Sequence, residues 1–263
     1  MVSEASDLAA EVANIAAEAG QFAIKLWDTD FRRWEKSPGN PVCAVDLEVD
    51  GMLRYRLGHL LPDAGWLSEE TIDNAARLDA ERIWVVDPID GTRDYLRGRP
   101  GWCVSVALVE KGRPVIGVLD APARHEVWTA QAGAGAFRNG ARLQVAERDQ
   151  LAGARVPADQ LSRIDRDLVT VAKPNSIALR IAMVAAGEAD LLATIRWGNE
   201  WDIAAAALLA QEAGAAVSDA FGRPLGFNTP KAEAFGVLAT APGIHAAAVA
   251  RLAERAAATV GQR

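Results

Sequence analysis

Hydrophobic residues near the N-terminus recur at alternating spacings of four and three. The positions in this stripe are Leu8, Val12, Ile15, Ala19, Phe22 and Leu26. This period is typical of one apolar face of a helix, and we expect the helix to begin after a cap at Ser6 or Asp7. A second stripe, ended by Pro62, comprises Val49, Met52, Leu53, Leu57 and Leu60. We expect Asp46 to cap this second helix.

Turn residues and short apolar runs fill the next part of the chain. The polar stretch 31–40 contains a Pro-Gly pair and predicts a loop or hairpin that carries Lys36. Residues 66–68 predict a short strand that runs into Glu69 and Glu70. Residues 83–86 predict a buried strand that ends at Asp87.

Further strands are expected after this point, over 102–109, 115–119 and 126–130. Asn139-Gly140, flanked by Phe137 and Leu143, predicts a two-residue hairpin turn. The first part of the chain is therefore expected to contain two long helices and a mostly antiparallel sheet.

From about Gln150, strands alternate with alanine-rich helices. The expected elements are a strand over 167–172, a helix over 177–186, a strand over 191–195 and a helix from about 200 to Gly214. This change predicts an N-terminal α+β lobe over residues 1–150 and a C-terminal α/β lobe over residues 151–263.

Composition and charge narrow the possible functions. The chain has 263 residues, is 50% hydrophobic and carries a net charge of −7, which argues against binding nucleic acid polymers or anionic membranes. Cys43 and Cys103 form no CxxC pair, and a small buried residue is the favoured reading of each. No apolar run is long enough to span a bilayer, and the acidic N-terminus does not resemble a signal peptide, so a cytoplasmic protein is expected.

Carboxylates are the main candidates for chemistry, because the three histidines have no ligand spacing. Asp87 and Asp90 lie three residues apart, with Gly91 and Thr92 directly after them. Two neighbouring acids are costly without a counter-charge, and Mg²⁺ prefers carboxylate and carbonyl oxygens, including that of Ile89. Backbone amides in a tight turn bind phosphate. The alternative is a strand-ending turn with two solvated acids.

Other candidates have ordinary structural alternatives. Asp202 precedes an alanine-rich run and is either a helix cap or a third acid at the metal site. Glu69 is either a solvated loop residue or a ligand brought beside Asp87 and Asp90 by the neighbouring strand. Asp46 is either a helix cap alone or a cap that also faces the metal site. Lys36 is either close to the site or an ordinary solvated loop lysine.

The strings Asp-Pro-Ile-Asp-Gly-Thr at 87–92 and Trp-Asp-Ile-Ala-Ala at 201–205 resemble the two signatures of the inositol monophosphatase superfamily, Mg²⁺-dependent and lithium-sensitive phosphatases. The resemblance implies a layered αβαβα sandwich and two or three Mg²⁺ ions, with Li⁺ as an inhibitor. The metal ligands that it implies are Glu69, Asp87, Asp90, Asp202 and the Ile89 carbonyl. It also implies a homodimer.

The same resemblance assigns the remaining roles. Gly91 and Thr92 would bind phosphate through their N–H groups, and Lys36 would lie close to it. Asp46 and Thr92 would help to orient the attacking water, with Glu69 as the further catalytic residue.

Details within the motifs favour one kind of substrate. Arg93-Asp94-Tyr95 is similar to the trio in 3'(2'),5'-bisphosphate nucleotidases, and Glu200 and the turn at 218–225 also resemble those enzymes. Residues 193–195 lack the glutamate that inositol phosphatases use on substrate hydroxyls. Ala206 departs from the family's usual Gly.

The favoured substrate is therefore 3'-phosphoadenosine 5'-phosphate, a small phosphorylated metabolite. Its second phosphate would contact Arg93, Ser176, Arg180 or Arg196, with Asp202 also on the substrate side. The alternatives are a phosphatase for inositol-1-phosphate, fructose-1,6-bisphosphate or histidinol phosphate, or a non-catalytic protein that binds phosphate compounds.

Overall fold

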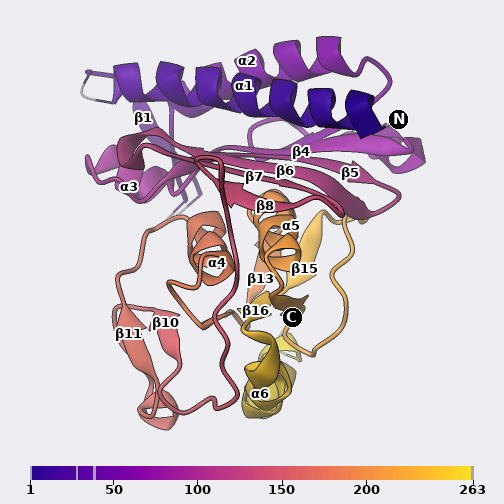
Figure 1. The fold of residues 1–263 in the computed structure, drawn as a ribbon. Coiled ribbons are helices and arrows are strands. Elements are labelled where there is room, and N and C mark those ends of the chain that lie inside the picture. The colour runs from indigo at the N-terminus through magenta and orange to yellow at the C-terminus, as the bar shows by residue number, and fades with distance from the viewer. Residues whose placement is uncertain (1, 28, 38–39, 262–263) are drawn as a thin grey trace.

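The molecule is a stack of helical and β layers, as Figure 1 shows from top to bottom. The computed structural model describes residues 2–27, 29–37 and 40–261, without the side chains of 2–6, 36, 37 and 40–42. The helices of the stack are α1 (Val2–Leu26), α2 (Ala44–Leu60), α4 (Ile177–Ala185), α5 (Ala204–Glu212) and α6 (His245–Val260). Helices α1 and α2 cover one face of the large sheet, and α4 and α5 cover the other. This is the layered αβαβα sandwich that the family resemblance implies.

The large sheet is mixed, and its strands follow chain order. They are β3 (Gly65–Ser68), β4 (Arg82–Asp90), β5 (Cys103–Glu110), β6 (Arg113–Ala121), β7 (Glu126–Gln131), β8 (Gly135–Arg138) and β9 (Ala141–Arg142). Among the described strands of this sheet, β3 and β4 pair in parallel and the other neighbours pair antiparallel. Asn139 and Gly140 both have positive φ, which confirms the predicted hairpin turn between β8 and β9.

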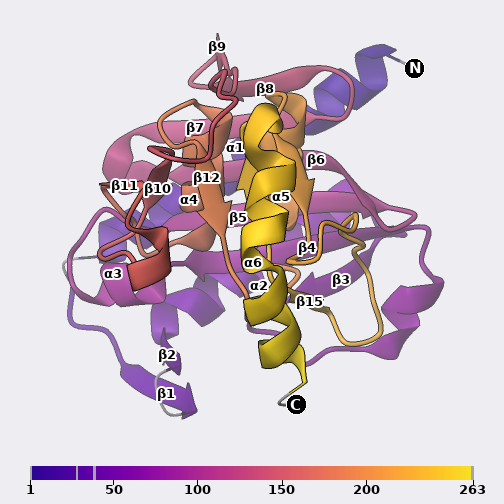
Figure 2. The ribbon, with the colours of Figure 1, turned by 90° about the horizontal axis from the view of Figure 1, so that it is seen from below.

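The lower part of the molecule contains shorter strands. They are β10 (Arg155–Pro157), β11 (Val169–Val171), β12 (Leu191–Ala193), β13 (Trp197–Asn199), β14 (Ala216–Ser218), β15 (Glu233–Phe235) and β16 (Leu238–Thr240). Three pair in the order β12-β16-β14, and β13 pairs with β15. Viewed from below, α6 lies in front, with α4 and α5 behind it (Figure 2).

Close packing brings α5 onto the sheet. Gly117 of β6 faces α5, and a Cβ added there would lie 2.7 Å from the carbonyl oxygen of Ala205. Ala204, Ala205 and Ala206 are fully buried, so small side chains on both sides allow this approach. The core around α4 and α5 includes residues from before and after the expected lobe boundary, and the two-lobe division stays a prediction.

Several predicted boundaries need correction. Helix α1 begins at Val2, ahead of the expected cap. The N-cap of α2 is Cys43, and Asp46 is the third helical residue, where its carboxylate accepts a hydrogen bond from the Cys43 N–H. Helix α5 begins at Ala204, so Asp202 lies in the preceding turn and does not cap it.

Strand β4 also differs from its prediction, because it continues past Val86 to Asp90. The register shifts between Asp87 and Asp90, and Pro88 lies inside this bulge. A proline cannot donate to a regular ladder but is accommodated at a bulge, which explains why the pairing resumes. The strands predicted at 167–172 and 191–195 are present but shorter, as β11 and β12.

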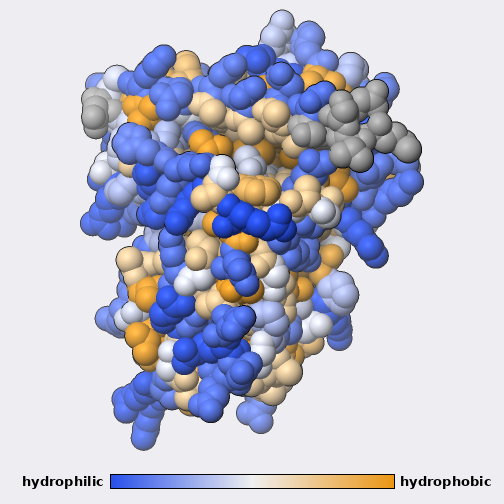
Figure 3. All heavy atoms as spheres, viewed as in Figure 1, coloured by the Kyte–Doolittle hydropathy of each residue, from blue (hydrophilic) through white to orange (hydrophobic). Residues whose placement is uncertain are grey.

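The remaining surface elements are β1 (Arg33–Ser37) and β2 (Asn40–Cys43), which pair as the predicted hairpin, and the short helix α3 (Thr92–Leu96). Hydrophilic and hydrophobic residues are interspersed on the face shown in Figure 3. Within the described ranges, none of the helices combines the length and apolar character that a bilayer span requires.

Candidate active site

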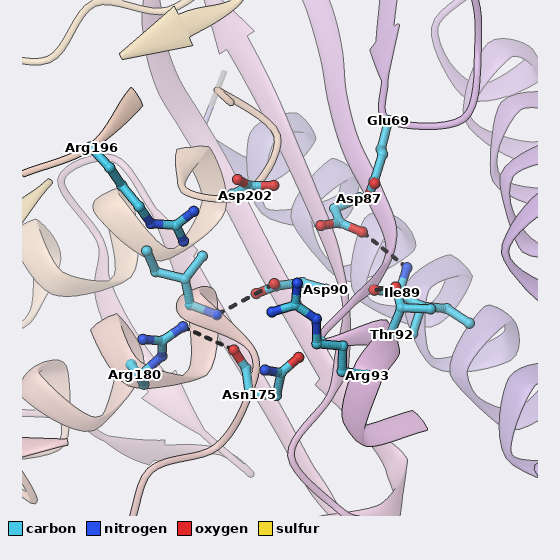
Figure 4. Close-up of a pocket in the computed structure, with 12 residues that line it drawn as sticks. Glu69, Asp87, Ile89, Asp90, Thr92, Arg93, Asn175, Arg180, Arg196 and Asp202 are labelled. Atoms are coloured by element: carbon cyan, nitrogen blue, oxygen red, sulfur yellow. Dashed lines mark hydrogen bonds between the residues drawn. The ribbon is translucent and has the colours of Figure 1, made fainter. Parts of the chain in front are cut away.

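One cavity collects most of the residues predicted to act together. Its volume is about 200 Å³, and it lies where β4 and α3 meet α4 and the turn before α5. The carboxylates of Glu69 and Asp87 enter it from one side, and the guanidinium groups of Arg180 and Arg196 point in from the other (Figure 4). The lining residues are Glu69, Asp87, Ile89, Asp90, Gly91, Thr92, Arg93, Asn175, Ile177, Arg180, Arg196 and Asp202.

The bulge in β4 positions two of the carboxylates. Asp87 accepts a hydrogen bond from the Ile89 N–H at 3.0 Å, which closes a turn around Pro88. This turn brings both Asp87 and Asp90 to the cavity although they are three residues apart on one strand. Gly91 follows with φ of 98°, a left-handed backbone conformation that favours glycine.

Asp90 is held by the N-terminus of α4. It accepts hydrogen bonds from the Ser176 hydroxyl at 2.5 Å and from the Ala178 N–H at 2.7 Å. Ser176 is fully buried, and its hydroxyl also accepts from the Leu179 N–H. Ser176 is not among the lining residues, so the structure favours a positioning role, and its assignment as a substrate contact stays a prediction.

Glu69 follows β3 directly and is supported by a residue that the sequence did not single out. Asp50 of α2 is buried and accepts hydrogen bonds from the hydroxyls of Ser68 and Thr71, which flank the glutamate pair. The sequence could have drawn attention to Asp50, because this acid lies directly beside the apolar stripe of a predicted helix. Its two partners, Ser68 and Thr71, are revealed only by the packing of α2 beside β3.

Asp202 reaches the cavity from a turn rather than from a helix. One of its oxygens accepts a hydrogen bond from the Asn199 N–H at 3.3 Å. The neighbouring Glu200 is fully buried and accepts from the Asn228 N–H at 2.6 Å and the Thr229 N–H at 2.9 Å. Glu200 therefore fastens the turn that carries Asp202 to a loop almost thirty residues away.

Thr92 and Asp46 are connected behind the cavity. The Thr92 hydroxyl lies 3.0 Å from the Ile89 carbonyl oxygen and 3.3 Å from one carboxylate oxygen of Asp46. Asp46 itself is buried and does not line the cavity. The Lys36 side chain lies outside the described part of the structure, so its predicted place near phosphate stays untested.

Burial and mutual repulsion govern the charge of these acids. The pKa of Asp87 is raised well above its usual range by burial and then by Glu69, Asp90 and Asp202. Burial, with Asp90 and Glu69, raises the pKa of Asp202 to about 8. Burial also raises the pKa of Asp90, although its hydrogen bonds from α4 oppose the shift.

A hard divalent cation fits this donor set, because it would remove the repulsion and it prefers carboxylate oxygens. Among the residues that the structure describes, no three histidine, cysteine or acidic side chains converge on one point as the ligands of a single ion do. The carboxylates of Glu69, Asp87, Asp90 and Asp202 line the cavity instead.

One of the two arginines on the cationic side of the cavity is held in position by backbone hydrogen bonds. Arg180 donates to the backbone oxygens of Asn175 at 2.9 Å and Ser176 at 3.1 Å, and burial lowers the pKa of this guanidinium. The sequence did not single out Asn175. No hydrogen bond or ion pair of the Arg196 side chain is found among the described residues, so its charge is available to a ligand.

Comparison with known proteins gives a consistent result. The profile of the inositol monophosphatase family matches residues 4–262. An inositol-1-monophosphatase of Mesorhizobium japonicum is 36% identical over 229 residues, covering 78% of this chain and 84% of that protein. The 3'(2'),5'-bisphosphate nucleotidase CysQ of Escherichia coli K12 is 32% identical over 235 residues, covering 84% and 94%. A solved IMPase structure from Thermotoga maritima has a TM-score of 0.80 at 29% identity and covers 92% of this chain and 95% of that one.

Proposed function

The chain belongs to the inositol monophosphatase family of phosphatases, and from that premise we propose that it is a Mg²⁺-dependent phosphomonoesterase acting on 3'-phosphoadenosine 5'-phosphate. The observation that carries the proposal is the cavity in which Glu69 and Asp87 face Arg180 and Arg196. Such a site accommodates a cation and a doubly phosphorylated ligand together.

In this proposal two or three Mg²⁺ ions would be held by the carboxylates of Glu69, Asp87, Asp90 and Asp202 and by the Ile89 carbonyl. Bound Mg²⁺ supplies Lewis acidity, which neutralises phosphate charge and makes a water molecule more acidic. The chain's own residues then bind and orient. The Gly91 and Thr92 amides bind the phosphate, and Glu69, Thr92 and Asp46 orient the attacking water, whose proton passes toward Asp46 through the Thr92 hydroxyl.

The substrate assignment rests on the second anionic group. Arg196 has no side-chain partner among the described residues, and Arg180 is pre-oriented by two backbone oxygens. Together with Arg93 they give the cavity a cationic side that a substrate with a single phosphate would leave unused. The similarity to CysQ, named as a bisphosphate nucleotidase, supports the same choice.

Inositol-1-phosphate is the second candidate, because several relatives of similar identity are named inositol-1-monophosphatases. The residues at 193–195 are Ala-Thr-Ile, and the Thr194 hydroxyl accepts a hydrogen bond from the Val237 N–H. This segment therefore offers no carboxylate to substrate hydroxyls, which favours the nucleotide. We also propose the homodimer and the sensitivity to Li⁺ that the resemblance implies.

The test is phosphate release with Mg²⁺ from 3'-phosphoadenosine 5'-phosphate, inositol-1-phosphate, fructose-1,6-bisphosphate and histidinol phosphate. We expect the nucleotide to lead by more than about tenfold in kcat/KM, roughly 1.4 kcal/mol of transition-state binding. Asp87→Asn should abolish release, because it removes a carboxylate from the centre of the cluster.

Two results would contradict parts of this proposal separately. A lead by an inositol or sugar phosphate would overturn the substrate and leave the phosphatase. No release from any ester, at any Mg²⁺ concentration, would favour a protein that binds phosphate compounds without turnover.

A further inference from the structure

A second and larger cavity adjoins the first one on the side of α3. Its volume is about 680 Å³, and Arg93 and Asn175 line both cavities. One wall is formed by α3 and the segment 97–101, and the other by the segment 172–175 and α4. We call this cavity the side groove. A ligand held in the catalytic cavity can therefore continue into the side groove past Arg93 and Asn175.

The side groove is cationic in a chain whose net charge is −7. Its five cationic lining residues are Arg93, Arg97, Arg99, Arg124 and Lys173, and its three acidic ones are Asp94, Asp159 and Glu188. The three acids and three of the cations, Arg93 among them, already have interaction partners.

Lys173 pairs with Asp159 at 2.6 Å, and Arg124 pairs with Glu126 at 2.8 Å. Arg97 and Arg99 are exposed, and in the described part of the chain their guanidinium groups have no hydrogen bond or ion pair. These two charges are therefore the excess positive charge of the groove.

The backbone holds these two arginines in a defined loop. The N–H groups of Arg97 and Arg99 both donate to the Asp94 carbonyl oxygen, at 3.1 Å and 2.9 Å. The Asp94 side chain accepts from the Asn175 N–H at 3.1 Å, which ties the two walls together. A Cβ added to Gly101 would lie 2.0 Å from an Asp94 carboxylate oxygen, so only glycine permits this link. The groove is thus formed before any ligand binds.

We propose that the side groove binds a further anionic group on the leaving-group side of the substrate, so that the site also removes the terminal 3'-phosphate from short oligonucleotides. This inference rests on the proposed function. With the 5'-phosphate of the terminal nucleotide at Arg180 and Arg196, a chain extended from that phosphate enters the groove, where Arg97 and Arg99 meet the next phosphate.

The smallest such substrate is a dinucleotide with phosphates at both ends. In its hydrolysis a water oxygen bonds to the terminal phosphorus, the bond from phosphorus to the 3' oxygen breaks, and that oxygen takes up a proton. The products are a dinucleotide with a free 3'-hydroxyl and inorganic phosphate. Long polymers remain excluded, because the net negative charge of the chain repels them beyond the groove.

The experiment compares three substrates with increasing 5' charge. They are adenosine 3'-phosphate, 3'-phosphoadenosine 5'-phosphate and the corresponding adenosine dinucleotide with 5'- and 3'-phosphates. The variant is Arg97→Glu combined with Arg99→Glu. Its matched control is Arg113→Glu. Arg113 is an exposed arginine at the start of β6, where it pairs with Glu110 of β5. This is the end of β5 opposite to Cys103, which pairs with Asp90 at the catalytic cavity.

We expect the double variant to lose about thirtyfold or more in kcat/KM for the dinucleotide and less than about threefold for adenosine 3'-phosphate. The plot of log kcat/KM against log salt concentration has a negative slope. For the dinucleotide alone, this slope should become less steep by about 0.7 per lost phosphate contact. Arg113→Glu should change neither quantity by more than about twofold.

Equal losses on all three substrates, or no loss on the dinucleotide, would overturn the proposal while leaving the phosphatase intact. A wild-type protein that hydrolyses 3'-phosphoadenosine 5'-phosphate but not the dinucleotide would also overturn it. If no phosphate ester is hydrolysed at all, the proposed function has failed instead, and the two failures are therefore distinguishable.

Discussion

At the scale of single residues, the thiol of Cys43 is connected to the proposed chemistry through Asp46. The Cys43 sulfur donates a hydrogen bond to one Asp46 oxygen at 2.8 Å, and the other oxygen faces the Thr92 hydroxyl. Burial, and then the charge of Asp46, raises the pKa of this thiol to about 12, so it stays protonated and remains a donor. Cys43 therefore fixes the orientation of Asp46.

Replacing this donor should reduce turnover without weakening substrate binding. Losing one hydrogen bond of about 1 kcal/mol predicts a roughly fivefold lower kcat for Cys43→Ala with KM unchanged. Cys43→Ser keeps a donor and should retain most of the activity. Asn74→Ala, which removes the cap of a short surface helix, controls for general loss of capping. A serine variant as slow as the alanine variant would contradict the positioning role.

A second residue, Asp120 of β6, is buried without a partner. One of its carboxylate oxygens makes no hydrogen bond within the described structure and faces Gly20 of α1. Its side chain is 3% exposed, and burial raises its pKa to about 7. The folded chain therefore binds this proton more tightly than the unfolded chain, whose carboxyl has the ordinary pKa of 3.8.

The free energy of unfolding should accordingly fall as the pH rises from about 4 to 7 and change no further above 7 through this group. Asp120→Asn removes the titration and should stabilise the protein at pH 8 by up to about 4 kcal/mol. Urea unfolding at pH 5 and pH 8 measures the difference, with the exposed Asp63→Asn as the control. An unchanged pH dependence in Asp120→Asn would show that the carboxyl is hydrated in solution.

At the scale of elements, the sequence predicted order and type better than boundaries. The helical stripes of α1 and α2 and the turn at Asn139 follow from local periodicity and turn chemistry, and the structure contains them. The continuation of β4 through Pro88 could not be predicted from local sequence, because it depends on β4 pairing with β5 again after the bulge. Local residue propensity predicts that the strand ends at Asp87-Pro88, but pairing with β5 extends it to Asp90.

Gly91 joins β4 to α3 and offers the sharpest test of an element junction. Its φ is 98°, and an added Cβ would lie 2.7 Å from the Gly101 oxygen and 2.9 Å from the Ser176 nitrogen. Gly91→Ala should therefore displace Asp90 and Thr92, with at least a hundredfold loss in kcat/KM, roughly 2.7 kcal/mol, and a lower Tm.

The control for Gly91 is Gly133→Ala, which has a similar φ of 76° but open space around the added methyl group. It should lose about 1 kcal/mol of stability from backbone strain alone and keep its activity. Equal effects of the two substitutions on kcat/KM would mean that the close contacts at Gly91 do not position the site.

At the scale of the whole molecule, the site is assembled from segments far apart in the sequence. Asp90 is held by Ser176 and Ala178, and Glu200 by Asn228 and Thr229. Asp87, Asp90 and Asp202 were readable from the two strings that contain them, because each string is local. Their supports, and the shared cavity with Arg180 and Arg196, depend on how α4 and the turn before α5 meet β4, and no single-sequence pattern encodes that.

This assembly makes the stability of the metal-free chain depend on pH in a definite direction. Asp87, Asp90 and Asp202 have raised pKa values, that of Asp202 about 8, so the folded state holds protons that the unfolded state releases. Stability without metal should therefore fall as the pH rises from about 4 to 8. Mg²⁺ competes with those protons, so its stabilising effect should grow over the same range.

Thermal unfolding with and without Mg²⁺ at pH 5.5 and pH 8 tests this coupling. Mg²⁺ at a hundred times its Kd stabilises by about 2.7 kcal/mol, which predicts a rise in Tm of at least about 5 °C at pH 8 and a smaller rise at pH 5.5. Asp87→Asn should raise the Tm of the metal-free protein at pH 8, because it removes a buried carboxylate that four neighbouring acids repel, and should abolish most of the response to Mg²⁺. A Mg²⁺ response that is equal at both pH values, or that survives in Asp87→Asn, would place cation binding elsewhere on this acidic chain and would separate the carboxylate cluster from the proposed chemistry.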